Sequence, residues 1–485
     1  MLANIDKYLA RHACDEARGI ASWAARVASS YRHACVIPAF DESVELIEGL
    51  AGALGPDHPP VLFVVVVNAT DAADPEIHAR NAGLCDALCA RARHVEVISD
   101  RPPIRRLSGV TCQGVAAGDA PATTLDVLLV DRTTPGHRLP PGHGVGLARR
   151  IGCDIALALR RAGTITGRWI HTTDADVTLP ADYFAATASA PAASVALTYP
   201  FWHLAEQHPS LALYEISLRY YVLGLRWAGS PYAHHTIGST LAVDAGAYAA
   251  CRGVPRRLAG EDFYLLNKLA KLGPLHAIFQ PRVEAIRIRA RESRRVPFGT
   301  GPATRRIAET LASNRPFRLY NPRSFAALAR WLEVIERYSQ SPAQEPRALL
   351  ASGRAGALQP GEVEILDSCL EAMGAFAAVL DARGRTRGTV ALKKRLWDWF
   401  DGFRTLKLIH RLRDAGHEDV PWASALDRAP FVSGMAPGAG RDLAPGGGAQ
   451  PGPELGHDLE AIRRTLVALE ERVARPGRQP SSPGA

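Results

Sequence analysis

Two aspartates at the end of a hydrophobic run are the strongest chemical feature of the chain. Asp174 and Asp176 follow a bulky, β-prone stretch at 168–173, and Pro180 and a helical pattern come after them. Residues two apart in an extended or tightly turning segment project to the same side, so the two carboxylates can meet. Carboxylates that close repel unless a cation or a proton joins them. The spacing indicates a divalent metal; the alternative is a polar strand end with Asp176 capping the next helix.

A second acidic pair, Glu261 and Asp262, begins a helical pattern after a glycine-containing loop. Carboxylates at a helix start also complement the helix dipole, so a purely structural role stays open. The pair lies downstream of residues 230–243 in the same predicted domain. There it would be a good source of a general base, because a hydroxyl attacks well only when a carboxylate accepts its proton.

Polar residues also follow the first two predicted strands. Pro38, Ala39, Asp41 and Glu42 come after the first strand, and Asn68 after the second. These strand ends could hold a cofactor or a nucleotide base. Asp41 could equally cap the next helix, with Glu42 in its first turn, and capping is compatible with ligand binding.

Arginines occur in two places that suit an anionic ligand. Arg149 and Arg150 lie in the helix before the aspartate strand, while Arg291, Arg294 and Arg295 belong to a run that ends in a glycine-rich turn. A guanidinium binds phosphate oxygens in pairs, so the run with Arg291, Arg294 and Arg295 is a candidate for a diphosphate or an acceptor. A run of arginines is also typical of a solvated face.

The elements that must position these residues alternate between strand and helix from about residue 35 to 290. Residues 61–67 are a continuous, mostly β-branched run, which suits a strand buried on both faces. Further strands are expected at 94–98, 125–130 and 195–199, helices at 74–92 and from 144 onward, and an inserted loop at 101–124. The alternation predicts a doubly wound α/β fold, whose ligands bind at the carboxyl ends of the strands.

The whole chain divides into six predicted parts. They are a helical lead-in at 1–32, the α/β domain at 33–315, a helical region at 316–428, a Gly/Pro-rich linker at 429–455, an amphipathic helix at 456–474 and a disordered tail at 475–485. Apolar residues of the last helix, from Leu455 to Val473, follow a coiled-coil spacing. This helix would dock on its own chain or give a weak self-association through 455–473.

Composition and charge indicate which ligands and which cellular compartment suit the chain. The 485 residues carry a formal charge of +8, a modest bias that fits anionic small ligands or a weak attraction to anionic lipid, and no nucleic-acid recognition module is evident. Eight scattered cysteines are typical of buried free thiols in a reducing cytoplasm. Charged residues near the N-terminus predict no secretion signal, and charges at 215, 219 and 226 argue against a membrane-spanning helix. The expected location is cytoplasmic, with peripheral contact at the inner membrane face left open.

Taken together, the motifs resemble the family 2 glycosyltransferases of GT-A fold over about residues 33–300. The first strand and its end at 36–42, the Thr173–Asp176 stretch, and the sequence from 238 to Asp262 with Tyr248 and Gly253 match the family's motifs in order. Two departures stand out: Asp41 takes the place of an asparagine, and residues 68–71 replace the paired aspartates that read uracil.

The resemblance implies an inverting, metal-dependent transfer of a sugar from a nucleotide-diphospho-sugar to a hydroxyl acceptor, which could be a carbohydrate, a lipid-linked molecule or a small molecule. Asp174 and Asp176 would hold Mg²⁺ or Mn²⁺ at the diphosphate, with Asp174 also near the ribose or sugar. Residues around Glu42 would contact the nucleotide, Arg149 and Arg150 would reach the diphosphate, and Asp262 would be the base. The fold implied is a GT-A, Rossmann-like mixed sheet with an α-helical C-terminal extension.

Two other classes remain open. A sugar-phosphate nucleotidyltransferase uses a similar sheet and acidic metal site, but it would normally carry a glycine-rich, basic loop where this chain has residues 38–43. A non-catalytic nucleotide-sugar-binding scaffold would use the C-terminal helix as its working part. Release of nucleoside diphosphate from a panel of donors separates both from a glycosyltransferase.

Overall fold

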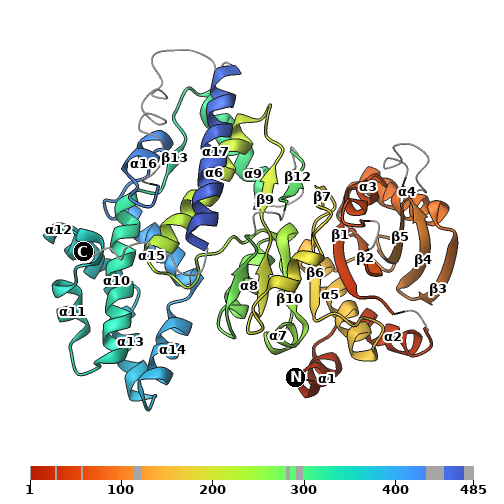
Figure 1. Ribbon diagram of the computed structural model, residues 1–485, viewed down its shortest axis with the longest axis horizontal. Helices are drawn as coiled ribbons and strands as arrows, with labels where there is room; N and C mark the ends of the chain where they lie inside the picture. The colour runs from red at the N-terminus through yellow and green to blue at the C-terminus, as the bar shows by residue number, and fades with distance from the viewer. Residues whose placement is uncertain are drawn as a thin grey trace. The chain divides into compact units, whose positions relative to one another are not determined.

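A computed structural model describes residues 2–27, 30–55, 58–112, 123–279, 284–290, 299–432 and 453–474, with side chains of the last segment from residue 458 (Figure 1). The chain forms two compact units. One consists of Met1–Leu204 with Thr236–Pro302, and the other of Ala205–His235 with Ala303–Ala485. The segment 205–235 therefore groups with the C-terminal helices, although the sequence places it inside the α/β domain.

The first unit is built on a nine-stranded mixed sheet with the order β11-β8-β10-β6-β1-β2-β5-β4-β3. Its centre, β6-β1-β2-β5, is parallel, whereas β10 runs antiparallel to both of its neighbours. A three-stranded sheet, β7-β12-β9, lies apart from it. The predicted mixed α/β fold is thereby confirmed. The strands are β1 (His33–Ala39), β2 (Val61–Asn68), β3 (His94–Asp100), β4 (Pro103–Thr111), β5 (Thr124–Arg132), β6 (Trp169–Thr172), β7 (Val177–Thr178), β8 (Ala196–Thr198), β9 (Phe201–His203), β10 (Leu241–Asp244), β11 (Leu275–Ala277) and β12 (Ile286–Ile288).

Strand β2 shows why the sheet needs cover on both faces. Its even-numbered residues, such as Val64, enter one hydrophobic core, and its odd-numbered residues, such as Val65, enter another. Helix α5 packs so closely on β1 and β2 that a Cβ at Gly152 would lie 2.3 Å from Val36 Cγ1. The helices of this unit are α1 (Leu2–Arg11), α2 (Asp15–Ala24), α3 (Leu46–Ala51), α4 (Pro75–Arg91), α5 (Val145–Ala162), α7 (Ala245–Ala250) and α8 (Glu261–Leu269), with short 3₁₀ turns η1 (Ala185–Ser189) and η2 (Gly238–Thr240).

The predicted loop at 101–124 is wrong over its first half, where β4 runs between β3 and β5. The buried residues of β4 are Ile104, Leu107 and Val110, which are three apart rather than two. Ile104 enters one hydrophobic core, whereas Leu107 and Val110 both enter the other. A register shift between Leu107 and Val110 lets these two residues, three apart, share a face. A bulge of this kind breaks the alternation by which a strand is found in a sequence.

The second unit is helical, as expected for 320–425. Phe325 and Trp331 of the long helix α10 are fully buried in it, and a two-stranded ribbon joins β13 to β14. Its elements are α6 (Pro209–Trp227), α9 (Thr300–Ala312), β13 (Arg318–Leu319), α10 (Pro322–Gln340), α11 (Pro346–Ser352), η3 (Ala355–Ala357), α12 (Pro360–Ala372), α13 (Ala375–Gly384), α14 (Thr389–Trp399), α15 (Gly402–Asp414), β14 (Val420–Pro421), α16 (Trp422–Arg428) and α17 (Pro453–Ala474).

Helix α17 docks on α6 of the same chain, which is the first of the two alternatives that its apolar spacing left open. Leu459, Ile462, Leu466 and Leu469 are all buried. The predicted self-association through 455–473 would have to use a seam that is already covered. Leu455 and the predicted tail lie outside the residues whose side chains are described.

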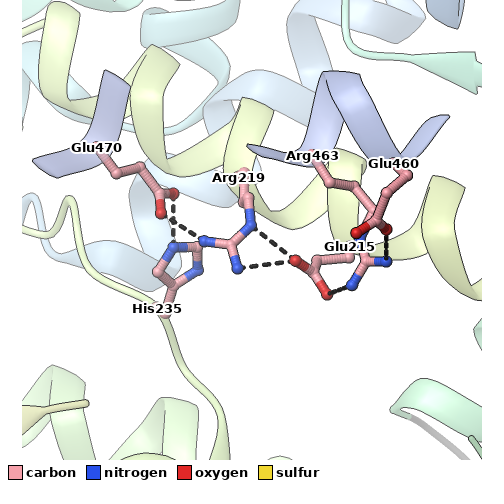
Figure 2. Close-up of polar contacts among 6 residues, drawn as sticks. All are labelled: Glu215, Arg219, His235, Glu460, Arg463 and Glu470. Carbon is pink, nitrogen blue, oxygen red and sulfur yellow. Dashed lines mark hydrogen bonds and ion pairs between the residues drawn. The ribbon is translucent and has the colours of Figure 1, made fainter. Parts of the chain in front are cut away.

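A chain of buried charges joins the two helices (Figure 2). Glu470 lies between His235 and Arg219, with Oε1 2.7 Å from the histidine Nε2 and Oε2 2.6 Å from the arginine Nη1. Glu215 then accepts from Arg219 at 2.8 Å and from Arg463 at 2.7 Å. Since an unpaired buried charge is costly, this pairing fixes the register of α17 on α6. We call it the α6–α17 ladder.

Two further sequence predictions concern membrane-spanning helices and the state of the cysteines. Across the described residues, none of the helices is both long and apolar enough to cross a membrane. All eight cysteines are free thiols, and seven of them are buried, as expected from their scattered positions.

Candidate functional site

The turn that carries the two aspartates is held by backbone contacts. Thr173 N–H donates to Val36 O at 3.0 Å, and its hydroxyl donates to Ser239 O at 2.8 Å. Beyond it, Ala175 is buried, while Asp174 and Asp176 are half-buried. The strand end therefore keeps both carboxylates beside the carboxyl end of β1, where sheets of this type bind ligands.

Arg149 reaches this turn from α5 but is buried. Its Nη2 lies 2.6 Å from Asp174 Oδ1, and its Nε lies 3.0 Å from Glu261 Oε1. Nη1 donates to the Gly238 carbonyl at 3.1 Å. Burial lowers the pKa of this guanidinium, but the two carboxylates outweigh that effect and raise it above its ordinary value. A permanent positive charge thus links the aspartate turn, the start of α8 and η2.

Glu261 and Asp262 begin α8 after Gly260, whose φ of 72° is the left-handed conformation that glycine adopts readily. The two side chains differ. Glu261 is buried on Arg149, whereas Asp262 is half-buried and accepts from Phe263 N–H at 2.7 Å. Burial and the neighbouring Glu261 carboxylate raise the pKa of Asp262 to about 7. A carboxylate with that pKa is suited to take and release protons near neutral pH.

At the ends of β1 and β2 the polar residues contact each other. Asn68 donates to Ala39 O at 2.9 Å, and Asp41 N–H donates to the Oδ1 of Asn81 at 2.9 Å. Asp41 has a φ of 58° and pairs with Arg80. Asn81, fully buried in α4, also donates to Asn68 O at 3.1 Å. Sequence reasoning missed Asn81, because a single polar residue in a helix gives no periodic signal.

The remaining predicted residues are distributed as follows. Pro38 lies within β1 and is buried, and Glu42 is half-buried just after it. Arg150 is turned away from Arg149: it donates to the carbonyls of Arg252, Val254 and His12, at 2.8–3.0 Å. The structure therefore does not bring Arg150 to the aspartate turn. Arg291, Arg294 and Arg295 lie outside the described residues.

The residues present fit a divalent metal that is bound jointly by the protein and by a substrate diphosphate. In the described part of the chain, no group of three or more His, Cys, Asp or Glu side chains is placed to hold a metal ion. Asp174 and Asp176 would supply two hard oxygen ligands. Mg²⁺ is commonly bound by one or two carboxylates together with substrate phosphates, so a diphosphate would complete this set.

Comparison with known proteins adds little. No protein-family model matches the chain, and no curated protein sequence matches it. Among solved structures, it is similar to the mannosyltransferase PcManGT from Pyrobaculum calidifontis in complex with GDP-Man and Mn²⁺. The identity is 17%, the match covers 85% of this chain and 97% of that chain, and the TM-score is 0.31. Similarity at this level supports no conclusion about the fold or the function of this chain.

Proposed function

We propose that the chain is a cytoplasmic, metal-dependent, inverting glycosyltransferase of GT-A fold that uses a nucleotide-diphospho-sugar and a hydroxyl acceptor. One observation carries the proposal. Arg149 joins two stretches almost ninety residues apart, the Asp174–Asp176 turn and the Glu261–Asp262 helix start, at one end of the sheet. A pair of metal-type carboxylates and a carboxylate with a pKa of about 7 are the two halves that such a transfer requires.

Each residue then has a role that its environment supports. Asp174 and Asp176 would hold the diphosphate end of the donor through Mg²⁺ or Mn²⁺, and the bound metal would stabilise the charge of the leaving diphosphate. Asp41, Asn68 and Glu42 would line the nucleotide. Asp262 would accept the proton of the attacking hydroxyl, and attack opposite the leaving group inverts the anomeric centre.

Arg149 has a different role from the one expected for it. Its donors are taken up by protein oxygens, so it would position Asp174 and Glu261 rather than bind the diphosphate itself. Through Glu261 it also affects Asp262, because the negative charge of Glu261 raises the pKa of that neighbour.

The test is a panel of nucleotide-diphospho-sugars, with Mn²⁺ and with or without acceptors, in which nucleoside diphosphate release is measured. Asp176→Ala should abolish metal-dependent binding of nucleoside diphosphate in calorimetry. Asp262→Asn should keep donor binding and lose roughly 10²–10⁴-fold in transfer, the usual contribution of a general base.

The outcomes separate the alternatives. Unchanged nucleoside diphosphate affinity in Asp176→Ala would count against the metal site, and full turnover in Asp262→Asn would remove the base assignment. Donor binding with no turnover across the panel would favour a scaffold. Pyrophosphate formation from a nucleoside triphosphate and a sugar phosphate would favour a nucleotidyltransferase.

A further inference from the structure

Helices α13 and α14 of the second unit carry a concentration of exposed positive charge. Over residues 383–395 the chain has six basic residues and no acidic one. All six are exposed: Arg383, Arg385, Arg387, Lys393, Lys394 and Arg395. The two helices pack against each other, and Arg385 and Arg387 lie in the segment that connects them. We call the charge gathered on this helical pair and its connecting segment the α13–α14 basic face.

Nearby carboxylates only partly compensate these cations. Asp381 binds Arg385 at 2.7 Å and lies 3.6 Å from Arg395. Glu336 binds Lys393 at 2.7 Å, and Asp398 binds Lys394. Four of the cations thus pair with three carboxylates, and both members of each pair are at least one-third exposed. Exposed pairs of this kind are weak and exchange readily for other anions.

The two helices also expose apolar side chains. Val390, in the first turn of α14, is 83% exposed, and Leu380 on α13 is 49% exposed. On α14, Leu392 and Leu396 are buried, so Val390 and Lys394 lie on the opposite, outward side. On α13, Leu380 and Arg383 are neighbours on one side by the same spacing. Each helix therefore presents an apolar residue beside a cation.

We propose that the α13–α14 basic face is a docking surface for an anionic lipid membrane. Lys and Arg near an anionic leaflet are attracted by its surface potential, and each raises partitioning by about fivefold. Val390 would enter the boundary between headgroups and acyl chains, which removes its side chain from water. The surface binds peripherally, and its function does not depend on the proposed transfer reaction.

The apolar residues decide between a membrane and a nucleic acid. A phosphate backbone would use the cations equally well, because its binding is largely electrostatic. An aliphatic side chain pointing to solvent gains nothing from a phosphate backbone, whereas a bilayer removes it from water. The combination of outward Val390 and outward cations on the same helical pair therefore favours lipid.

The experiment is cosedimentation of the full chain with vesicles of phosphatidylcholine alone or with about one-third phosphatidylserine. The chain should bind only the anionic vesicles, and less as salt rises. The triple variant Arg383→Gln, Arg387→Gln, Lys394→Gln should lose on the order of 100-fold in partitioning, from about fivefold for each charge. Val390→Ser should lose about fivefold, and this loss should persist at high salt.

A matched control removes the same number of exposed cations elsewhere in the second unit, with Arg306→Gln, Arg411→Gln and Arg428→Gln. It should bind like the unaltered chain, and thermal unfolding should show that all variants are folded. Equal losses in the control would mean that net charge alone acts, which overturns the proposal. The proposal would also be overturned if the chain did not bind anionic vesicles. Tight binding to a short single-stranded RNA that Val390→Ser leaves unchanged would overturn it as well.

Discussion

This chain contains two buried networks of carboxylates and arginines, and they differ in how exposed their carboxylates are. In the α6–α17 ladder, both oxygens of Glu470 and both of Glu215 bind protein partners, and both carboxylates are essentially inaccessible. Around Arg149 the arginine is equally buried, but Asp174 keeps 36% of its side chain exposed and Asp262 is half-buried.

The difference separates docking from chemistry. The α6–α17 ladder is a closed network: it has one geometry and no place for a further ligand, so it fixes how two elements pack. The network around Arg149 is an open network: its arginine is buried, but its outer carboxylates face solvent and can interact with a ligand. The pKa values follow the same division: His235 and Arg219 hold the pKa of Glu470 below its usual range against the effect of burial, whereas burial and Glu261 raise that of Asp262.

The largest expected effect comes from removing the centre of the open network. Arg149→Ala leaves Glu261 buried without its cation, and this should cost about 3–5 kcal/mol in the free energy of unfolding. Urea denaturation measures it. Arg161→Ala, on the same helix but in an exposed pair with Asp6, is the control and should leave stability nearly unchanged. Equal losses in both variants would show that the buried contacts of Arg149 have no special weight.

Sequence reasoning named both the outer carboxylates of the open network and Arg149 at its centre, but it did not predict the contacts that join them. Asp174, Asp176 and Asp262 follow strand ends or begin a helix, and such positions can be read along the chain. The buried contacts of Arg149 cannot, because they depend on where α5, α8 and η2 meet in space. Its expected role at a diphosphate came from its residue type and from its place in the helix before the aspartate strand.

The fold shows a similar limit. Residues 61–67 were recognisable as a strand because every residue is apolar and mostly β-branched. Strand β4 was hidden by its bulge, and the α6–α17 ladder was hidden because its partners are some 250 residues apart. His235 in particular had no role in the sequence, where nothing marks Glu470 as its partner.

A smaller effect is expected from opening the closed network. Glu470→Gln keeps the shape but removes the charge that holds Arg219 and His235, while Arg219 keeps Glu215. The cost should be about 2–3 kcal/mol, less than for a cation left with no partner. Hydrogen exchange of α17 amides should increase. Glu471→Gln removes one charge from the next, half-buried residue and is the control; faster exchange there to the same extent would contradict a role for the ladder in docking α17.

The smallest effect is a difference in pH dependence between the two networks. Asp262 has a folded pKa of about 7, above its ordinary value of 3.8, so its contribution to stability is full below pH 3.8 and is lost as pH rises through about 7. Glu470 has a lowered pKa, so its contribution is present above its ordinary value of 4.5 and is lost only as pH falls below that value. Of these two carboxylates, therefore, Asp262 is the one that should titrate between pH 5 and 8.

Asp262→Asn should gain stability over the unaltered chain as pH rises. The gain should be about 1–2 kcal/mol, because water screens a half-buried carboxylate. Thermal unfolding of Asp262→Asn and of the unaltered chain at pH 5, 6, 7 and 8 measures this. Parallel curves for the two would mean that Asp262 ionises as an ordinary carboxylate, which would remove the pKa argument for it as the base.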